Sequence, residues 1–143
     1  MFKNILVVCV ANICRSPIVD VLLQDALPLK NVSSAGINAL VGKPMHENSV
    51  KLTAPLGVDC SLHAARQLTA EICRENDVIL VMEKGHIDAV MAIDPTVKGK
   101  IFLVGKWLAD TEIPDPYKQS FEMYEHVFEL IKKSTDAWVK KLK

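Results

Sequence analysis

Cys9 and Arg15 are two side chains suited to phosphoryl chemistry, and five residues separate them in the segment Cys9-Val10-Ala11-Asn12-Ile13-Cys14-Arg15. A loop of this length can wrap its backbone amides around one tetrahedral oxyanion, with the sulfur below it and the guanidinium beside it. A planar guanidinium donates two parallel hydrogen bonds to phosphoryl oxygens, which the ammonium of a lysine cannot do. The spacing therefore predicts a site where a thiolate nucleophile and an arginine meet the same phosphorus atom.

The residues after the loop predict a helix that faces the anion. We expect Ser16 to be the N-cap and Pro17 to be the first helical residue, because serine satisfies a free amide and proline lacks one. The free N–H groups and the positive dipole end of that helix then favour an anion in the loop, and favour the thiolate form of Cys9. Other phosphate motifs fit poorly. The chain has no Gly-x-Gly-x-x-Gly, and Gly36 to Gly42-Lys43 is one residue too long for a P-loop.

Three runs of branched apolar residues predict buried parallel strands. They are Ile5 to Val10, Val78 to Met82 and Ile101 to Val104, with a weaker strand expected at Val32 to Ala35. Helical patterns lie between them, at Ile18 to Leu23, Val50 to Leu56 and Ile87 to Met91. The alternation predicts an α/β fold, a three-layer sandwich with a short parallel sheet of about four strands and helices on both faces. Ligands bind beyond the carboxyl ends of such strands, where the Cys9 loop lies.

The last segment of the chain is expected to be one helix with one core-facing side, because its apolar residues follow steps of three and four. They are Phe121, Tyr124, Phe128, Ile131, Trp138 and Leu142, with Thr135 in the one gap. A coiled coil is the alternative, but only about three heptads are present. We therefore expect this face to pack on the core of the same chain.

Length and charge exclude several protein classes. The 143 residues fit a single domain spanning positions 1–143. Seventeen Lys and Arg balance seventeen Asp and Glu, so no global field attracts nucleic acid or an anionic membrane. The longest apolar run has seven residues, far fewer than the roughly 20 needed to span a bilayer. We expect a cytoplasmic protein without a secretory signal, whose four cysteines are free thiols.

The segment from Cys9 to Pro17 closely resembles the signature loop of low-molecular-weight protein tyrosine phosphatases, and the resemblance covers essentially the whole chain. Further matching blocks follow in the order of that family: Ser34-Ala35-Gly36, His63 to Leu68, Asp77 to Glu83, and Ile113-Pro114-Asp115-Pro116-Tyr117. The sequence is most similar to bacterial members that partner tyrosine autokinases in capsule and exopolysaccharide export. The resemblance implies a phosphotyrosine phosphatase that uses no metal and no cofactor and acts on such a kinase.

The resemblance assigns catalytic roles to three residues. It implies that Cys9 attacks phosphorus and becomes a phosphocysteine, while Arg15 and the loop amides hold the equatorial oxygens. It also implies that Asp115 protonates the departing tyrosyl oxygen and then activates the water that hydrolyses the thiophosphate. The prolines on both sides of Asp115 support this role independently of the resemblance, because they stiffen the segment that carries the carboxyl group.

The walls of the substrate site are also expected from the resemblance. Tyr117 is similar to the aromatic residue that flanks the phenyl ring of the substrate, and Ile13 and Leu40 are further candidate walls. Ser16 resembles the hydroxyl that donates to the thiolate. The sequence leaves open whether this role or the helix cap dominates.

Two further residues are candidate supports of the loop. Asn12 tolerates a left-handed backbone, and the family pairs this asparagine with a serine and a histidine. The positions that match are Ser34 and His63.

Ala11 and Cys14 raise separate questions. The family usually has glycine where this chain has Ala11, so we expect Ala11 to keep a negative φ and the cradle to stay intact. Cys14 resembles a cysteine that forms a disulfide with the nucleophile and shields it from irreversible oxidation. An apolar filler is an equal alternative for Cys14.

Other functions remain as alternatives. An arsenate reductase has the same fold and loop but uses a cysteine pair in its later half, and no cysteine follows Cys73 here. We interpret Cys60 and Cys73 as structural. A non-catalytic phosphotyrosine-binding module is the second alternative. Such a module needs neither a thiolate nor an acid, whereas this chain has both Cys9 and Asp115. Scattered histidines and the absence of Cys-x-x-Cys predict no metal site.

Overall fold

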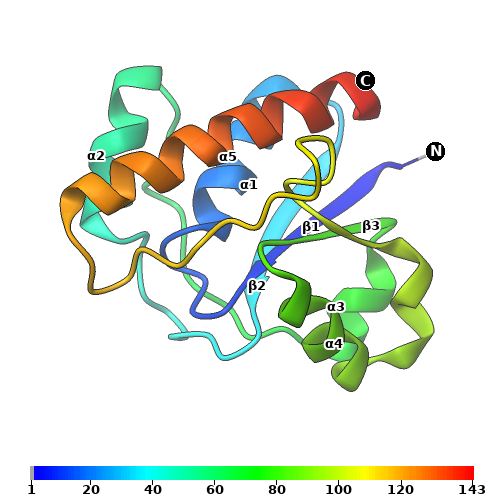
Figure 1. Ribbon diagram of the computed structural model, residues 1–143. Coiled ribbons are helices and arrows are strands. Elements are labelled where there is room, and N and C mark those ends of the chain that lie inside the picture. The colour runs from blue at the N-terminus through cyan, green and yellow to red at the C-terminus, as the bar shows by residue number, and fades with distance from the viewer. Residues whose placement is uncertain (1) are drawn as a thin grey trace.

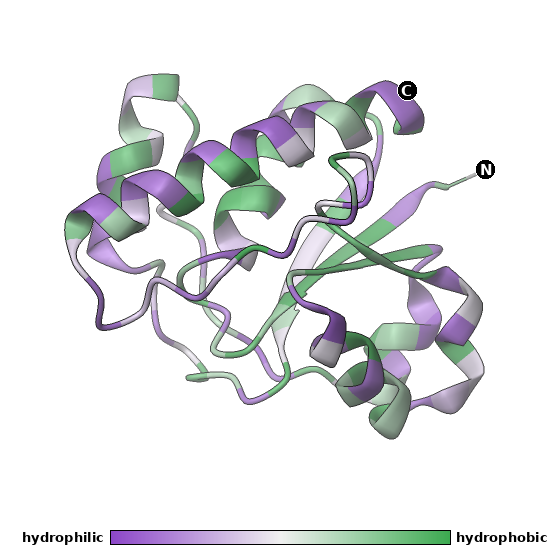
Figure 2. Ribbon diagram, viewed as in Figure 1, coloured by the Kyte–Doolittle hydropathy of each residue, from purple (hydrophilic) through white to green (hydrophobic). Residues whose placement is uncertain are grey.

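Four parallel strands form the centre of the computed structural model, which describes residues 2–143. The strands are β1 (Asn4–Cys9), β2 (Asn31–Gly36), β3 (Val78–Val81) and β4 (Ile101–Leu103). Their spatial order is β2-β1-β3-β4, and every pairing is parallel. Figure 2 shows β1 and β3 as mostly hydrophobic, whereas the edge strand β2 is paler because its sequence is NVSSAG. The predicted strands are confirmed, with ends that differ by one residue.

Helices cover both faces of this sheet. They are α1 (Ser16–Ala26), α2 (Glu47–Thr53), α3 (Ala70–Glu75), α4 (Lys84–Ile93) and α5 (Phe121–Leu142), with short 3-10 helices at Ala54–Leu56 and Pro95–Lys100. Figure 1 shows α1, α2 and α5 on one side of the sheet and α3 and α4 on the other. The predicted three-layer α/β sandwich is therefore confirmed.

Alternate residues of β1 contribute to two separate cores, because successive side chains of a strand point to opposite faces. Ile5 and Val7 pack in the core that also holds residues of α1 and α5. Leu6 and Val8 pack with residues of α3 and α4. Since β1 is buried on both faces, its sequence is continuously apolar rather than alternating.

The C-terminal segment forms the single helix that its periodicity predicts. Its buried face includes Tyr124, Ile131 and Trp138, and the helix packs against α1 and α2 within the same chain. Phe121 is an exception, because it is 41% exposed at the first turn of α5. The prediction that Phe121 belongs to the core-facing side is therefore wrong.

Two helical segments were not expected from the sequence. Helix α3 has six residues, and the 3-10 helix at Pro95–Lys100 has six, so neither is long enough to display a clear apolar period. The predicted helix Val50 to Leu56 is divided at Thr53, where α2 ends and a 3-10 turn begins. Among the described residues, no helix is both long and apolar enough to cross a membrane.

Candidate active site

The Cys9 loop lies where the order of the strands reverses. From β1 the chain crosses to β2 on one side, and later returns to β3 on the other side of β1. In open parallel sheets this arrangement leaves a crevice beyond the carboxyl end of the central strand. We call residues 9–15, which fill that crevice, the phosphate loop.

The carbonyl groups of the phosphate loop point away from its centre toward the chain that follows β2. The backbone N–H groups of Ile37, Asn38, Leu40 and His46 donate to the carbonyls of Cys9, Val10, Ala11 and Ile13, respectively, at 2.8–3.1 Å. No backbone N–H from Val10 to Arg15 donates to an acceptor in residues 2–143. A close approach of the two segments is required, since a Cβ on Gly36 would lie 2.4 Å from the carbonyl oxygen of Val10. The loop thus keeps a row of free donors, as an anion site requires.

Cys9 and Ser16 lie together at the base of the loop. The Cys9 Sγ is 2.9 Å from the Ser16 Oγ, and both residues are buried. Ser16 Oγ also accepts a hydrogen bond from Asn12 Nδ2 at 2.8 Å, so its own hydroxyl hydrogen is available to the sulfur. The expected N-cap role of Ser16 is wrong. Helix α1 begins at Ser16, its N-cap is Arg15, and no side chain caps it.

Asn12 holds the loop through every polar atom of its side chain. It is fully buried and has a φ of 63°, in the left-handed region that asparagine tolerates. Its Nδ2 donates to Ser16 Oγ at 2.8 Å and to Ser34 Oγ at 3.0 Å, while its Oδ1 accepts from the Arg66 backbone N–H at 3.0 Å. A buried amide with all its partners present fixes the loop, because breaking any of these bonds leaves an unsatisfied group.

The expected support residues both contact Asn12. Ser34 accepts from the side chain as described, whereas the His63 Nε2 lies 2.7 Å from the Asn12 backbone oxygen. Arg66 adds two bonds to β2, from Nε to the Ser34 carbonyl and from Nη2 to Ser33 Oγ. Asp20 is a buried acid next to Ser34. Burial raises the pKa of its carboxyl group, although hydrogen bonds from Gln24 and Ser34 act in the opposite direction.

Arg15 is oriented by groups on the far side of the crevice. The side chain is 2% exposed, and its Nη1 donates to Glu83 Oε2 at 2.6 Å and to the Ile113 carbonyl at 2.8 Å. Its Nε and Nη2 form no hydrogen bond with residues 2–143. One edge of the guanidinium is therefore tethered, and the other edge remains available as a two-pronged donor.

Ala11 has the backbone that its methyl group requires. It is not among the non-glycine residues with positive φ, which in residues 2–143 are Asn12, Ala109, Asp110 and Lys118. The expectation of a negative φ at Ala11 is confirmed. The loop places its one left-handed residue at Asn12 instead.

Asp115 and Tyr117 lie on a separate segment, residues 113–117, which we call the acid segment. Asp115 Oδ2 is 3.8 Å from Arg15 Nη2, and the carboxyl group is 49% exposed. Its Oδ1 accepts from the Tyr117 backbone N–H at 3.0 Å, which closes a local turn. The segment begins at Ile113, whose N–H donates to the Met82 carbonyl at 2.9 Å. The acid segment thus brings a carboxyl group to the free edge of the arginine.

Comparison with known proteins identifies the family of this chain. The family model described as low molecular weight phosphotyrosine protein phosphatase matches residues 4–143. The chain belongs to this family.

Individual relatives agree with the family match along the full length. The probable low molecular weight protein-tyrosine-phosphatase AmsI of Erwinia amylovora is 46% identical over 142 residues, which cover 99% of each chain. The Etp phosphatase of Escherichia coli K12 is 47% identical over 141 residues, covering 99% of this chain and 95% of the relative. The structure of Vibrio vulnificus Wzb in complex with benzylphosphonate superposes with a TM-score of 0.95 at 46% identity, covering 99% of both chains. The protein is a phosphatase of the protein-tyrosine class.

The three side chains expected to be walls of the substrate site come from three segments. Ile13, Leu40 and Tyr117 line one hollow, and Leu40 and Tyr117 are 42% and 37% exposed. The rings of Tyr117 and His46 are nearly perpendicular, with centroids 6.0 Å apart, and His46 stacks on Tyr124 with centroids 5.1 Å apart. His46 also caps α2 by accepting from the Asn48 N–H at 3.1 Å. Sequence reasoning missed this linking role, because histidine at a helix cap carries no distinct motif.

Cys14 is a second buried cysteine of the phosphate loop, and its contacts differ from those of Cys9. Its sulfur lies 3.5 Å from the Tyr124 hydroxyl. Burial raises the pKa of Cys14 to about 11, against the opposing hydrogen bond with Tyr124. All four cysteines carry free thiols, and Cys73 is fully buried. Cys14 is therefore a neutral thiol near pH 7.

Glu83 and His86 are the site residues that sequence reasoning passed over. Glu83 forms the ion pair with Arg15, and its backbone N–H donates to His86 Nδ1 at 3.3 Å at the start of α4. The His86 pKa is lowered, mainly by burial and then by the nearby positive charge of Arg15. The sequence did contain a signal for Glu83, because this charged residue directly follows the apolar run Val78 to Met82. Among residues 2–143, no group of three or more potential metal ligands is found.

Proposed function

We propose that this phosphatase hydrolyses phosphotyrosine in two steps through a phosphocysteine on Cys9. One observation carries the proposal: Cys9 Sγ lies 2.9 Å from the Ser16 hydroxyl within the phosphate loop, whose free amides and arginine edge surround the same space. In the first step the sulfur forms a bond to phosphorus and the bond from phosphorus to the tyrosyl oxygen breaks. Cys9 acts as a thiolate, which the loop amides, the start of α1 and the Ser16 hydroxyl stabilise together.

Arg15 and the loop amides bind the three equatorial oxygens. The Nε and Nη2 edge suits two phosphoryl oxygens, since Nη1 is already used by Glu83 and Ile113. The remaining oxygen is left to the backbone N–H groups of residues 10–15. Donors held in place before the reaction are effective, because they need no rearrangement as charge develops.

Asp115 is the proton donor and then the proton acceptor. As phosphorus leaves the tyrosyl oxygen, Asp115 gives that oxygen its proton. In the second step a water oxygen bonds to phosphorus, its proton passes to Asp115, and the sulfur–phosphorus bond breaks to restore the thiolate. Such acid–base help contributes about 10² to 10⁴ in rate.

An aryl leaving group fits the site better than an alkyl one. Ile13, Leu40 and Tyr117 present apolar surface beside the phosphate loop, and an aromatic ring gains from stacking against Tyr117. These apolar walls favour phosphotyrosine over phosphoserine, which has no ring to contact them.

We propose that Cys14 is a buried filler of the phosphate loop, because its neutral thiol is a poor attacking group near pH 7.

We further propose that the physiological substrate is a bacterial tyrosine autokinase that controls capsule or exopolysaccharide production in the cytoplasm. The support is the similarity to AmsI, Etp and Wzb, all of them low molecular weight phosphatases at 44% identity or more. The direct check is removal of phosphate from a purified phosphorylated autokinase, with a phosphoserine protein as the control.

The test of the mechanism is hydrolysis of a series of aryl phosphates across pH. Cys9→Ser is expected to abolish turnover, whereas Cys60→Ser is the matched control and keeps it. Asp115→Asn is expected to cause a defect that grows as the leaving group becomes more basic, and the exposed Asp136→Asn is its control. A Cys9→Ser enzyme that retained normal turnover would refute the phosphocysteine, and a defect independent of the leaving group would refute the role of Asp115.

A further inference from the structure

A hollow of about 730 Å³ extends from the catalytic site along the loop that precedes α2. Its lining includes Ile13, Leu40, Lys43, Val50, Lys51 and Tyr117. We call this hollow the flanking groove. Ile13 belongs to the phosphate loop, and Tyr117 follows Asp115 by two positions, so the groove is continuous with the space around the substrate ring.

The wall of the flanking groove is held rigidly by the phosphate loop itself. Leu40 N–H donates to the Ala11 carbonyl at 3.1 Å, and His46 N–H donates to the Ile13 carbonyl at 2.8 Å. Between them, the Lys43 carbonyl accepts from the Ala65 N–H at 2.8 Å. A preformed wall loses little conformational entropy on binding a peptide.

The charge of the flanking groove is locally positive, although the whole chain has a formal net charge of zero. Lys43 and Lys51 line it, with Glu47 as the one lining acid. Within residues 2–143, neither ammonium group forms an ion pair. The Lys51 ammonium instead lies 6.0 Å from the centre of the Phe121 ring. Two unpaired lysines beside exposed apolar side chains complement an acidic and apolar peptide.

We propose that the flanking groove binds the residues next to the phosphotyrosine of a protein substrate. In this arrangement Leu40 stays beside the substrate ring, Val50 contacts an apolar side chain next to the phosphotyrosine, and Lys43 and Lys51 attract an acidic one. The groove thereby makes the phosphatase selective for phosphotyrosines in acidic, apolar surroundings. This inference rests on the proposed phosphotyrosine hydrolysis and adds the class of sequence that is preferred.

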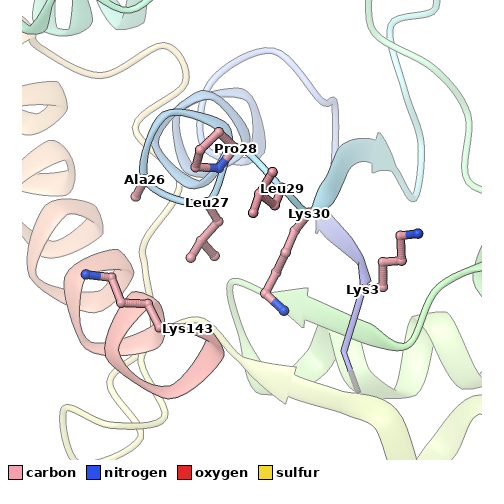
Figure 3. Close-up of a pocket in the computed structure, with 7 residues that line it drawn as sticks. All are labelled: Lys3, Ala26, Leu27, Pro28, Leu29, Lys30 and Lys143. Carbon is pink, nitrogen blue, oxygen red and sulfur yellow. The ribbon is translucent and has the colours of Figure 1, made fainter.

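A second hollow provides a control of similar character. It has a volume of about 500 Å³ and is lined by Lys3, Leu27, Leu29 and Lys30 among others (Figure 3). Lys3 precedes β1, whereas Cys9 ends it, so this hollow lies at the opposite end of the sheet. It combines lysines with apolar side chains as the flanking groove does, but it has no access to the phosphate loop.

The experiment compares kcat/KM for two phosphotyrosine peptides and for a simple aryl phosphate. One peptide carries glutamate and leucine beside the phosphotyrosine, and the other carries lysine and serine. In Lys43→Glu/Lys51→Glu, we expect the ratio of the acidic peptide to the aryl phosphate to fall about tenfold, because two exposed attractive charge contacts are replaced by repulsive ones. Val50→Ser should lower the ratio for peptides with leucine but not for those with serine. Lys3→Glu should leave every ratio as in the parent protein.

The outcomes separate this inference from the proposed function. If the ratio of kcat/KM for the acidic peptide to that for the aryl phosphate were equal in the parent and in Lys43→Glu/Lys51→Glu, the inference would be overturned. Continued hydrolysis of the aryl phosphate would leave the proposed function intact. An equal loss on all three substrates would also overturn it, because the lysines would then act on the phosphate site. A concentration-dependent dimer abolished by the same double variant would assign the groove to a second copy of the chain instead. A parent protein that hydrolysed no aryl phosphate would refute the proposed function.

Discussion

The phosphate loop and the acid segment face the same substrate but are held in different ways. In the phosphate loop Asn12 is fully buried and Arg15 is 2% exposed, and both are bonded to distant elements. In the acid segment Asp115 is 49% exposed and its carboxyl group bonds to Tyr117 two residues along. The loop that is proposed to bind the anion is therefore held in place before the substrate arrives, whereas Asp115, the proposed proton donor, keeps access to solvent. A donor that must also activate water requires that access.

In this comparison of the two regions, the largest expected effect is at Arg15, which joins them. Arg15→Lys replaces the planar guanidinium by one ammonium, which cannot donate to Glu83 and to two phosphoryl oxygens in the same geometry, so we expect kcat/KM to fall about 10²- to 10³-fold. Steady-state hydrolysis of an aryl phosphate measures this change. The control is Arg74→Lys, because Arg74 pairs with Asp94 while 59% exposed. Comparable activity in the two variants would show that the fork geometry of Arg15 is not used.

The next effect tests whether the phosphate loop depends on its buried amide. Asn12→Gly keeps the left-handed backbone but removes three side-chain hydrogen bonds. We expect kcat/KM to fall at least about tenfold and unfolding free energy to fall by about 1–3 kcal/mol, since buried partners are left unsatisfied. The exposed Asn38→Gly is the control in the same assays. Loss of stability without loss of turnover would show that the loop is not held in place for catalysis.

A smaller effect tests the stiffness of the acid segment. Pro114→Ala frees the residue before Asp115, and we expect kcat to fall about two- to fivefold, corresponding to the roughly 0.4–1 kcal/mol by which proline restricts a chain. Pro28→Ala, in the exposed turn after α1, is the control. An unchanged kcat in Pro114→Ala would mean that the local turn at Asp115 positions the carboxyl group alone.

Ala11→Gly should change turnover less than these variants. Ala11 has a normal backbone in the structure, so the methyl group imposes no strain that glycine could relieve. We expect kcat/KM to stay within about threefold of the parent protein, a limit of roughly 0.6 kcal/mol. A rise in turnover beyond about tenfold would show that the native loop is compromised.

The smallest effect concerns acid stability and His86. Its pKa is lowered below 6.5 in the folded state by burial and by Arg15, so the unfolded chain binds more protons below that pH. Stability contributed by neutral His86 is therefore present above about pH 6.5 and is lost as the pH falls toward the folded pKa. In His86→Gln, the free energy of unfolding, measured with denaturant, should fall less steeply as the pH drops below about 6.5. His126→Gln is the control. Identical pH slopes would contradict this assignment.

The sequence by itself determined the parts of the protein that are local. The spacing of Cys9 and Arg15, the apolar strand before them and the helix after them predicted the phosphate loop, and the period of α5 predicted one long helix. The Ser16 cap was predicted wrongly, because the local rule ignored Cys9 and Asn12, which engage the same hydroxyl. Short helices such as α3 were missed because six residues hold too little of a period.

The family resemblance pointed to Ser34 and His63 as partners of Asn12, but only the tertiary structure decided which other distant groups complete the site. Arg15 is tethered by Glu83 and by the carbonyl of Ile113, which lie 68 and 98 positions away. Asn12 is held by Ser34 and by the Arg66 N–H, 22 and 54 positions away. Such contacts leave no periodic pattern in the sequence, since each joins single groups on segments that are far apart along the chain. They form because parallel strands bring their carboxyl ends to one edge, where the following loops meet.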